Sequence, residues 1–329
     1  MEQNAARRPS AGSDAVHLPV MRSRVVELLA PALERPGAVH VDGTIGMGGH
    51  AQAVLEACPR ALLVGIDRDT EALELARRRL ERFDDRVRLV HAVHDELPEV
   101  LDDLGIDRVD SILLDLGLSS LQIDRADRGF AYSVDSPLDM RMDQSTGPTA
   151  AQLINTADQA ELARIIFRYG EDRNARRIAR AIVEERTRRP FDGSAQLVRV
   201  IEDAIPAAVR HRSHGHPAKK TFQALRIAVN GEMDTLSTVL PEALDRLAVG
   251  GRMAVLAYHS LEDRPVKDAF RAVCSDSAPA GLPVVPESMS ARFVAVTHGA
   301  ERPDAEEIAV NPRSASARLR VIRRIKEAA

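Results

Sequence analysis

A glycine-rich stretch near the start of the chain has the composition of a ligand-binding turn. In VDGTIGMGGHA (41–51), four glycines remove four Cβ atoms within seven residues, so the backbone can adopt positive φ angles and approach a bound molecule. A helix expected from about Gly49 would direct free N–H groups into the same space. The spacing Gly46-x-Gly48-x-x-Ala51, followed by Asp67, satisfies a dinucleotide-binding fingerprint. A tight turn without a ligand is the alternative.

Acidic residues at three predicted strand ends discriminate between cofactors. Asp67 would bind a ribose hydroxyl of NAD or of S-adenosylmethionine equally well, so this residue does not distinguish between the two cofactors. Asp42 precedes the glycines, and Asp115 ends the strand in ILLDLGLSS. Hydride transfer needs no carboxylate at Asp115, whereas methyl transfer to an amine benefits from a group that accepts the amine's hydrogens. S-adenosylmethionine is therefore favoured, and an NAD-dependent oxidoreductase is the alternative.

Other reactive side chains limit the reactions that this protein could catalyse. Cys58 and Cys274 match no metal or redox spacing, and neither lies in a sheet-edge motif, which argues against methylation of a ring carbon by a cysteine nucleophile. His259, Glu262 and Asp263 in YHSLEDR could assist proton removal, contact substrate or cap a helix. A metal site is not expected.

Alternating strands and helices predict the scaffold that positions these residues. Strands are expected at 39–42, 61–67, 87–91 and 111–115, with helices at 20–33, 49–57, 70–83 and 97–104. Such βαβ alternation predicts a parallel sheet with ligands at the carboxyl ends of its strands. A further buried strand is expected at 252–259, and strands at 292–298 and 317–322 can pair antiparallel at the edge. The fold class is α/β, a Rossmann-like sheet with an inserted small helical domain.

The insertion interrupts the strand pattern between Gln122 and Met253. Residues 124–143 are expected to form an ordered surface loop, 150–189 and 196–209 to be helical, and 211–220 to form a cationic loop. Helices follow at 221–230, at 235–247, ended by Gly250-Gly251, and at 267–273. We divide the chain into a disordered tail (1–14), a sheet domain (15–127 and 217–329) and an inserted helical substrate-recognition domain (128–216).

Composition describes a soluble globular protein: 44% of the 329 residues are hydrophobic and 29% are charged. No apolar run approaches the roughly 18 residues of a membrane span, and the N-terminus lacks the apolar core of a signal peptide. We therefore expect a cytoplasmic protein without a membrane role.

Charge is unevenly distributed along the chain. Residues 161–220 contain 14 Lys plus Arg against 8 Asp plus Glu, a net of +6, which leaves −10 for the rest of a chain of net charge −4. A basic middle segment is typical of a nucleic-acid contact. The candidates for phosphate contacts are Arg173, Arg176, Arg177, Arg180, Lys219 and Lys220. A solvated charged face is the alternative.

Several motifs, in order, resemble the bacterial small-subunit ribosomal RNA cytosine-N4 methyltransferase family, RsmH/MraW. They are GTIGMGGHA, GIDRD, ILLDLGLSS with Gln122, DRGFAYSVDSPLDMRMD, RYGED, HPAKKTFQALRIAVN, AYHSLEDR and NPRSASARLR. The resemblance covers nearly the whole chain. It implies S-adenosylmethionine as cofactor and, as substrate, a cytidine in the decoding region of 16S ribosomal RNA in the small subunit. It places cofactor contacts on Gly48, Gly49, His50, Asp67, His94, Asp115 and Gln122. Ala315 and Lys220 stand where the family often has arginine.

The chemistry implied is methylation of an exocyclic amine whose lone pair is delocalised into the ring. We expect Asp115 to position the amine, while Phe130, Tyr132 or Tyr258 covers the base; Asp115, Tyr258 and His259 are the candidate catalytic residues. The alternative for Asp115 is a helix-capping or ribose-binding acid. A non-catalytic RNA-binding assembly factor is a further alternative, and a homodimer is neither indicated nor excluded.

Overall fold

The computed structural model describes residues 18–207, 215–279 and 285–327. Its sheet has seven strands in the order β3-β2-β1-β4-β5-β7-β6. The strands are β1 (Val39–Asp42), β2 (Leu62–Asp67), β3 (Val87–His91), β4 (Val109–Asp115), β5 (Leu247–Ala257), β6 (Phe293–Ala295) and β7 (Arg318–Arg324). The first five are parallel, and β7 pairs antiparallel with both β5 and β6. The predicted parallel sheet with an antiparallel edge is therefore confirmed.

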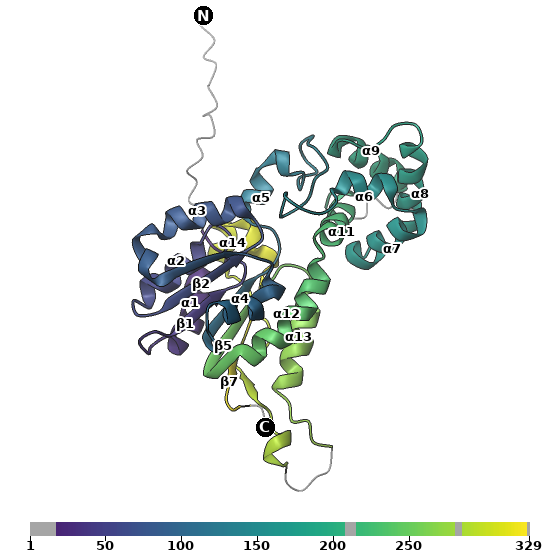
Figure 1. Cartoon of the computed structure of the whole chain (residues 1–329). Helices are drawn as coiled ribbons and strands as arrows, with labels where there is room; N and C mark the ends of the chain where they lie inside the picture. The colour runs from purple at the N-terminus through teal and green to yellow at the C-terminus, as the bar shows by residue number, and fades with distance from the viewer. Residues whose placement is uncertain (1–17, 208–214, 280–284, 328–329) are drawn as a thin grey trace, which may run out of the picture.

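Helices cover both faces of this sheet (Figure 1). One face carries α4 (Leu97–Asp103), α12 (Glu232–Arg246) and α13 (Ser260–Val273), which share an apolar cluster with the strands. The other face carries α1 (Arg22–Leu29), α2 (Gly49–Ala57) and α3 (Thr70–Leu80). Strand order reverses between β1 and β4, so their carboxyl ends form the topological switch point where ligands bind in such sheets.

A second core belongs to a helical unit beside the sheet, which Figure 1 shows in teal and green. Its helices are α6 (Ala150–Thr156), α7 (Gln159–Gly170), α8 (Ala175–Arg186), α9 (Ser194–Ala204) and α11 (Lys219–Asn230). Phe222 and Leu225 of α11 pack in this core, which therefore extends beyond the boundary expected at 216. Two further short helices are α5 (Ser120–Asp124) and α14 (Ala305–Val310).

Segment 124–143 is not the surface loop that we expected. Phe130, Leu138 and Met140 are buried in the core of the helical unit. The segment lacks periodicity because its apolar side chains enter that core from irregular backbone. Sequence periodicity therefore underestimated how much of this segment is buried.

Two helix boundaries also differ from prediction. Helix α12 ends at Arg246 and the chain enters β5 directly, so Gly250-Gly251 lies inside a strand rather than at a helix end. A Cβ on Gly251 would lie 2.8 Å from the Ala248 carbonyl oxygen, so close backbone approach explains this glycine. Helix α13 begins at Ser260, earlier than the 267 expected.

Some expectations fall outside the described residues: the tail at 1–14, the end of the helix expected at 196–209, and residues 211–214 of the cationic loop. Within the described ranges, no helix combines the length and the apolar character that crossing a bilayer requires.

Candidate active site

A pocket opens at the carboxyl ends of β1, β2 and β4, bordered by the glycine-rich turn. Six of the seven predicted cofactor contacts line it: Gly49, His50, Asp67, His94, Asp115 and Gln122. The pocket also receives Met142 from the segment before the helical unit, and Glu232 and Glu262 from helices α12 and α13. Residues far apart in sequence thus meet at the switch point.

Gly48 is the exception among the predicted contacts. It does not line the pocket, and a Cβ added to it would lie 3.4 Å from Ala76 and Leu80 of α3. Its N–H donates to the carbonyl of Ile45 at 2.8 Å. Gly48 has φ 76° and caps α2, so the backbone conformation there requires glycine, and its contact with the cofactor stays a prediction.

Asp67 ties the turn to the end of β2. Its Oδ2 accepts a hydrogen bond from the Gly46 N–H at 2.7 Å, and its Oδ1 accepts one from the Asp69 N–H at 2.9 Å. Burial raises the pKa of Asp67 to about 6. The carboxylate therefore shapes the turn, while the unused lone pairs of its oxygens remain for a ligand.

Two histidines on the pocket wall have buried ring nitrogens that make no hydrogen bond to any described residue. Both ring nitrogens of His50 and the Nε2 of His94 make no hydrogen bond within the described chain. Burial lowers the pKa of His94 to about 4, so its ring is neutral at pH 7. Buried polar atoms are usually satisfied, and unpartnered ones on a pocket wall are therefore available to a bound molecule.

Asp115 is held on the pocket wall by two neighbours. Its backbone N–H donates to Thr44 Oγ1 at 2.6 Å, and Tyr258 Oη donates to its Oδ1 at 2.7 Å. Burial and the nearby carboxylate raise the pKa of Tyr258 well above its ordinary value, so the phenol stays protonated and donates. Asp115 Oδ2 lies 3.5 Å from His50 Nε2. One carboxylate oxygen is thus occupied, and the other faces an unpartnered histidine.

The aromatic cover over the base stays a prediction, and its three candidates lie in different surroundings. Phe130 lies in the core of the helical unit, and Tyr132 stacks on His216 with ring centroids 4.8 Å apart. Tyr258 binds Asp115 but does not itself line the pocket. The residues that line the pocket in the described chain include no phenylalanine or tyrosine.

His259 caps α13 and does not itself line the pocket, whereas Glu262 does, and a catalytic role for His259 stays a prediction. Its Nδ1 accepts from the Glu262 N–H at 3.3 Å, and its Nε2 lies 3.0 Å from Glu262 Oε1. Burial opposes ionisation of Glu262, but this histidine and the Arg226 guanidinium hold the pKa of that carboxyl below its usual value. Asp263 instead binds Arg318 and Arg320. Capping, one of the roles weighed for this motif, describes His259.

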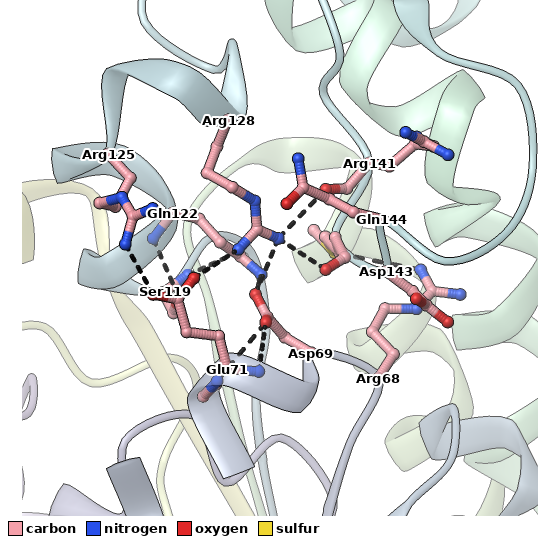
Figure 2. Close-up of polar contacts among 12 residues, drawn as sticks. Arg68, Asp69, Glu71, Ser119, Gln122, Arg125, Arg128, Arg141, Asp143 and Gln144 are labelled. Atoms are coloured by element: carbon pink, nitrogen blue, oxygen red, sulfur yellow. Dashed lines mark hydrogen bonds and ion pairs between the residues drawn. The ribbon is translucent and has the colours of Figure 1, made fainter. Parts of the chain in front are cut away.

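Gln122 reaches the pocket through a polar network that sequence reasoning missed (Figure 2). Its Nε2 donates to Asp69 Oδ2 at 3.0 Å, and Arg128 Nη2 donates to the same oxygen at 2.8 Å. Arg128 is only 2% exposed and also donates to the Met142 carbonyl at 2.7 Å. The network joins β2, α5 and the entry to the helical unit. A buried arginine inside a charged, turn-rich motif gave no local signal of this role.

The family model for the MraW methylase family matches residues 14–325. The chain belongs to this family. The resemblance drawn from the motifs is therefore confirmed.

Individual relatives of this MraW-family chain are similar over nearly full length. Ribosomal RNA small subunit methyltransferase H from Cutibacterium acnes is 69% identical over 96% of this chain and 94% of its own. The protein of the same name from Streptomyces avermitilis is 56% identical over 96% of this chain and 99% of its own. Among solved structures, an rRNA methylase from Streptococcus thermophilus aligns with a TM-score of 0.43 at 12% identity, covering 92% of this chain and 95% of that one.

The basic candidates of this MraW-family chain lie away from the pocket, on the helical unit. Arg173 precedes α8, whose exposed residues include Arg176, Arg177 and Arg180. Lys219 and Lys220 begin α11, and the Lys220 ammonium donates to the Glu171 carbonyl at 3.2 Å. All six are exposed, so they are accessible to a large anionic partner.

Proposed function

We propose that this chain transfers a methyl group from S-adenosylmethionine to the N4 amino group of a cytidine in the decoding region of 16S ribosomal RNA, within the small ribosomal subunit in the cytoplasm. Membership of a methylase family and the names of the full-length relatives support it. The observation that carries it is Asp115 on the pocket wall, whose Oδ1 accepts from Tyr258 while its Oδ2 accepts no hydrogen bond from the described residues and lies 3.5 Å from His50 Nε2.

The pocket residues suit S-adenosylmethionine, which supplies an electrophilic methyl group when bound. Asp67 offers carboxylate lone pairs to ribose hydroxyls, and the unpartnered rings of His50 and His94 offer polar atoms to the rest of the molecule. Asp115 adds a carboxylate to the same wall, where negative charge stabilises a sulfonium cation. Asp42 adds a carboxyl group that is only partly ionised near neutral pH, because burial raises its pKa to about 7. Gln122 is held ready by Asp69.

Asp115 would act on the substrate amine. A hydrogen bond from N4–H to Asp115 Oδ2 orients the nitrogen lone pair toward the methyl carbon. As the new N–C bond forms and the sulfur–methyl bond breaks, N4 must lose one proton. Asp115 accepts it directly or through water, and Tyr258 keeps the carboxylate from rotating away. His50, 3.5 Å from Oδ2, is placed to contact either the carboxylate or the cofactor.

Substitution of Asp115 tests this proposal. Asp115→Asn and Asp115→Ala should lower methyl transfer by about 10²–10⁴-fold, the usual contribution of a positioned proton acceptor. Asparagine should retain cofactor binding, since it keeps the shape and one acceptor oxygen. Mass spectrometry of nucleosides from 16S ribosomal RNA measures the product, and calorimetry measures cofactor affinity. Wild-type turnover in both variants would overturn the catalytic role, and a melting temperature raised by NAD but not by S-adenosylmethionine would overturn the cofactor assignment.

A further inference from the structure

An exposed aromatic ring lies in a hollow on the helical unit, away from the cofactor pocket. Phe167 on α7 is 64% exposed and is the one aromatic residue among the exposed large hydrophobic side chains of the described chain. The hollow runs between α7 and the start of α8, and Ala160 and Ala163 are among the residues that line it. Small residues beside the ring leave its face open to a flat molecule.

Three arginines line the same hollow as this ring. Arg164 comes from α7, while Arg173 and Arg176 come from the turn and the first residues of α8. The side chains of Arg173 and Arg176 make no ion pair or hydrogen bond with any described residue, and Arg164 Nη2 lies 3.7 Å from Glu161 Oε1. The hollow therefore combines one open π face with a net positive rim.

We propose that this hollow binds a single-stranded segment of the RNA substrate, with one base stacked on Phe167 and the neighbouring phosphates on Arg164, Arg173 and Arg176. The proposal rests on the proposed function, which makes RNA the substrate. Base stacking on an exposed aromatic ring beside arginines is how proteins bind unpaired nucleotides with little sequence preference. The hollow would hold a nucleotide that flanks the target rather than the target itself.

The position of α7 suits a flanking nucleotide. Glu171 directly follows α7 and accepts a hydrogen bond from Ser260 Oγ at 3.1 Å. Ser260 starts α13, two residues before Glu262, which lines the pocket. The helix that carries Phe167 is thus anchored at the pocket rim. A symmetric contact between two copies through this hollow is disfavoured, because it would oppose two sets of arginines.

Binding of unreactive RNA separates this site from the catalytic pocket. The probe is a fluorescein-labelled single-stranded oligouridine of 12 nucleotides, which contains no cytosine, titrated with the full-length protein by fluorescence anisotropy. Phe167→Ala should weaken binding by about tenfold, and Phe167→Trp should retain it because the π face remains. Val310→Ala, which also truncates an exposed apolar side chain on α14, should bind like wild type. Each of Arg173→Gln and Arg176→Gln should reduce the slope of log affinity against log salt by about 0.7.

Wild-type affinity in Phe167→Ala, with an unchanged melting temperature, would overturn the site. Sedimentation velocity provides a second readout: if the substitution dissociates a dimer and leaves RNA affinity unchanged, the hollow is a subunit interface and the proposal fails. The proposed function fails separately. If the wild-type protein methylates 16S ribosomal RNA but Phe167→Ala binds oligouridine normally, only the RNA site in the hollow is disproved. If RNA binding depends on Phe167 but no cytosine is methylated, only the proposed methyl transfer is disproved.

Discussion

At the scale of single residues, the three aspartates at the sheet edge have the same side chain but different surroundings. Asp115 is hydrogen-bonded by Tyr258, and Asp67 accepts two backbone N–H groups. Asp42 is 1% exposed, and the hydrogen bond that it accepts from the Thr44 N–H is a long 3.2 Å. Burial raises the pKa of Asp42 to about 7, so it is partly protonated near neutral pH. Environment therefore assigns distinct roles to identical carboxyl groups.

This environment predicts a pH-dependent stability for Asp42→Asn. The pKa of Asp42 is about 7 in the folded protein, against the ordinary value of 3.8. The folded state therefore binds the proton more tightly than the unfolded state does. Through this group, the wild type loses stability as pH rises from about 4 to 7. Asparagine cannot ionise and still accepts from the Thr44 N–H. Between pH 4 and 8, the unfolding free energy of Asp42→Asn minus that of the wild type should increase by up to ~4 kcal/mol.

Urea unfolding at a series of pH values measures this difference. His40 and His94, whose pKa values burial lowers to about 3 and about 4, stabilise the folded state as pH rises, but they are present in both proteins and cancel. Asp103→Asn changes an exposed carboxylate and serves as the control. Parallel pH profiles for wild type and Asp42→Asn would contradict the prediction.

At the scale of elements, one carboxylate joins three parts of the fold. Asp69 caps α3 by accepting from the backbone N–H groups of Glu71 and Ala72. Its other oxygen accepts from Gln122 and Arg128, as Figure 2 shows. Arg128 in turn donates a hydrogen bond to the carbonyl oxygen of Met142, a residue that lines the pocket. The cofactor pocket and the entry to the helical unit are therefore mechanically linked.

Arg128→Met should break this link. Removing the guanidinium leaves Asp69, whose side chain is 4% exposed, without its buried ionic partner, so the protein should lose ~3–5 kcal/mol of stability. Cofactor affinity should also fall, because Met142 loses a hydrogen bond to its carbonyl and Asp69, which holds Gln122, loses its ionic partner. Urea unfolding and calorimetric titration with S-adenosylmethionine measure the two effects.

Arg125→Met is the matched control. Arg125 is 47% exposed and pairs with Glu71 and Asp127, so its loss should cost less than ~1 kcal/mol. If both variants unfold at the same urea concentration and bind the cofactor equally, Arg128 does not anchor the pocket.

At the scale of the whole molecule, charge divides along the fold. The basic segment 161–220 contributes to the helical unit, whereas the rest of the chain carries the excess negative charge. Electrostatic attraction should therefore direct RNA to the helical unit. The hydrogen bond at the end of α7 then fixes how this unit, with its bound RNA, is oriented relative to the pocket.

Charge reversal on α8 tests this arrangement. Arg177→Glu with Arg180→Glu should weaken RNA binding at low salt and make affinity less sensitive to salt, because fewer counterions are released. The control reverses two exposed arginines of α3, Arg77 and Arg78, and should change binding little. RNA affinity that is insensitive to salt, or equal losses in both double variants, would show that α8 is only a solvated surface.

Local sequence determined the sheet and most of the pocket. Strand periodicity and glycine spacing depend on neighbouring residues, so β1 to β4, the glycine-rich turn and the acids Asp42, Asp67 and Asp115 at the strand ends could be read directly. The topology of parallel strands then required their carboxyl ends to meet, which brought Asp67 and Asp115 together in prediction as in structure. The motifs that resemble the MraW family supplied Gln122, for which local pattern gives no reason.

Tertiary structure alone decided which side chains pair across the chain. Tyr258 binds Asp115 from 143 positions away, and Arg128 binds Asp69 from 59 positions away. It also buried Phe130 and turned His259 into a helix cap. Periodicity reports the face on which a residue lies, but not which distant surface packs there. Partners such as Tyr258 for Asp115 are fixed only when packing removes both from water and makes their hydrogen bond necessary.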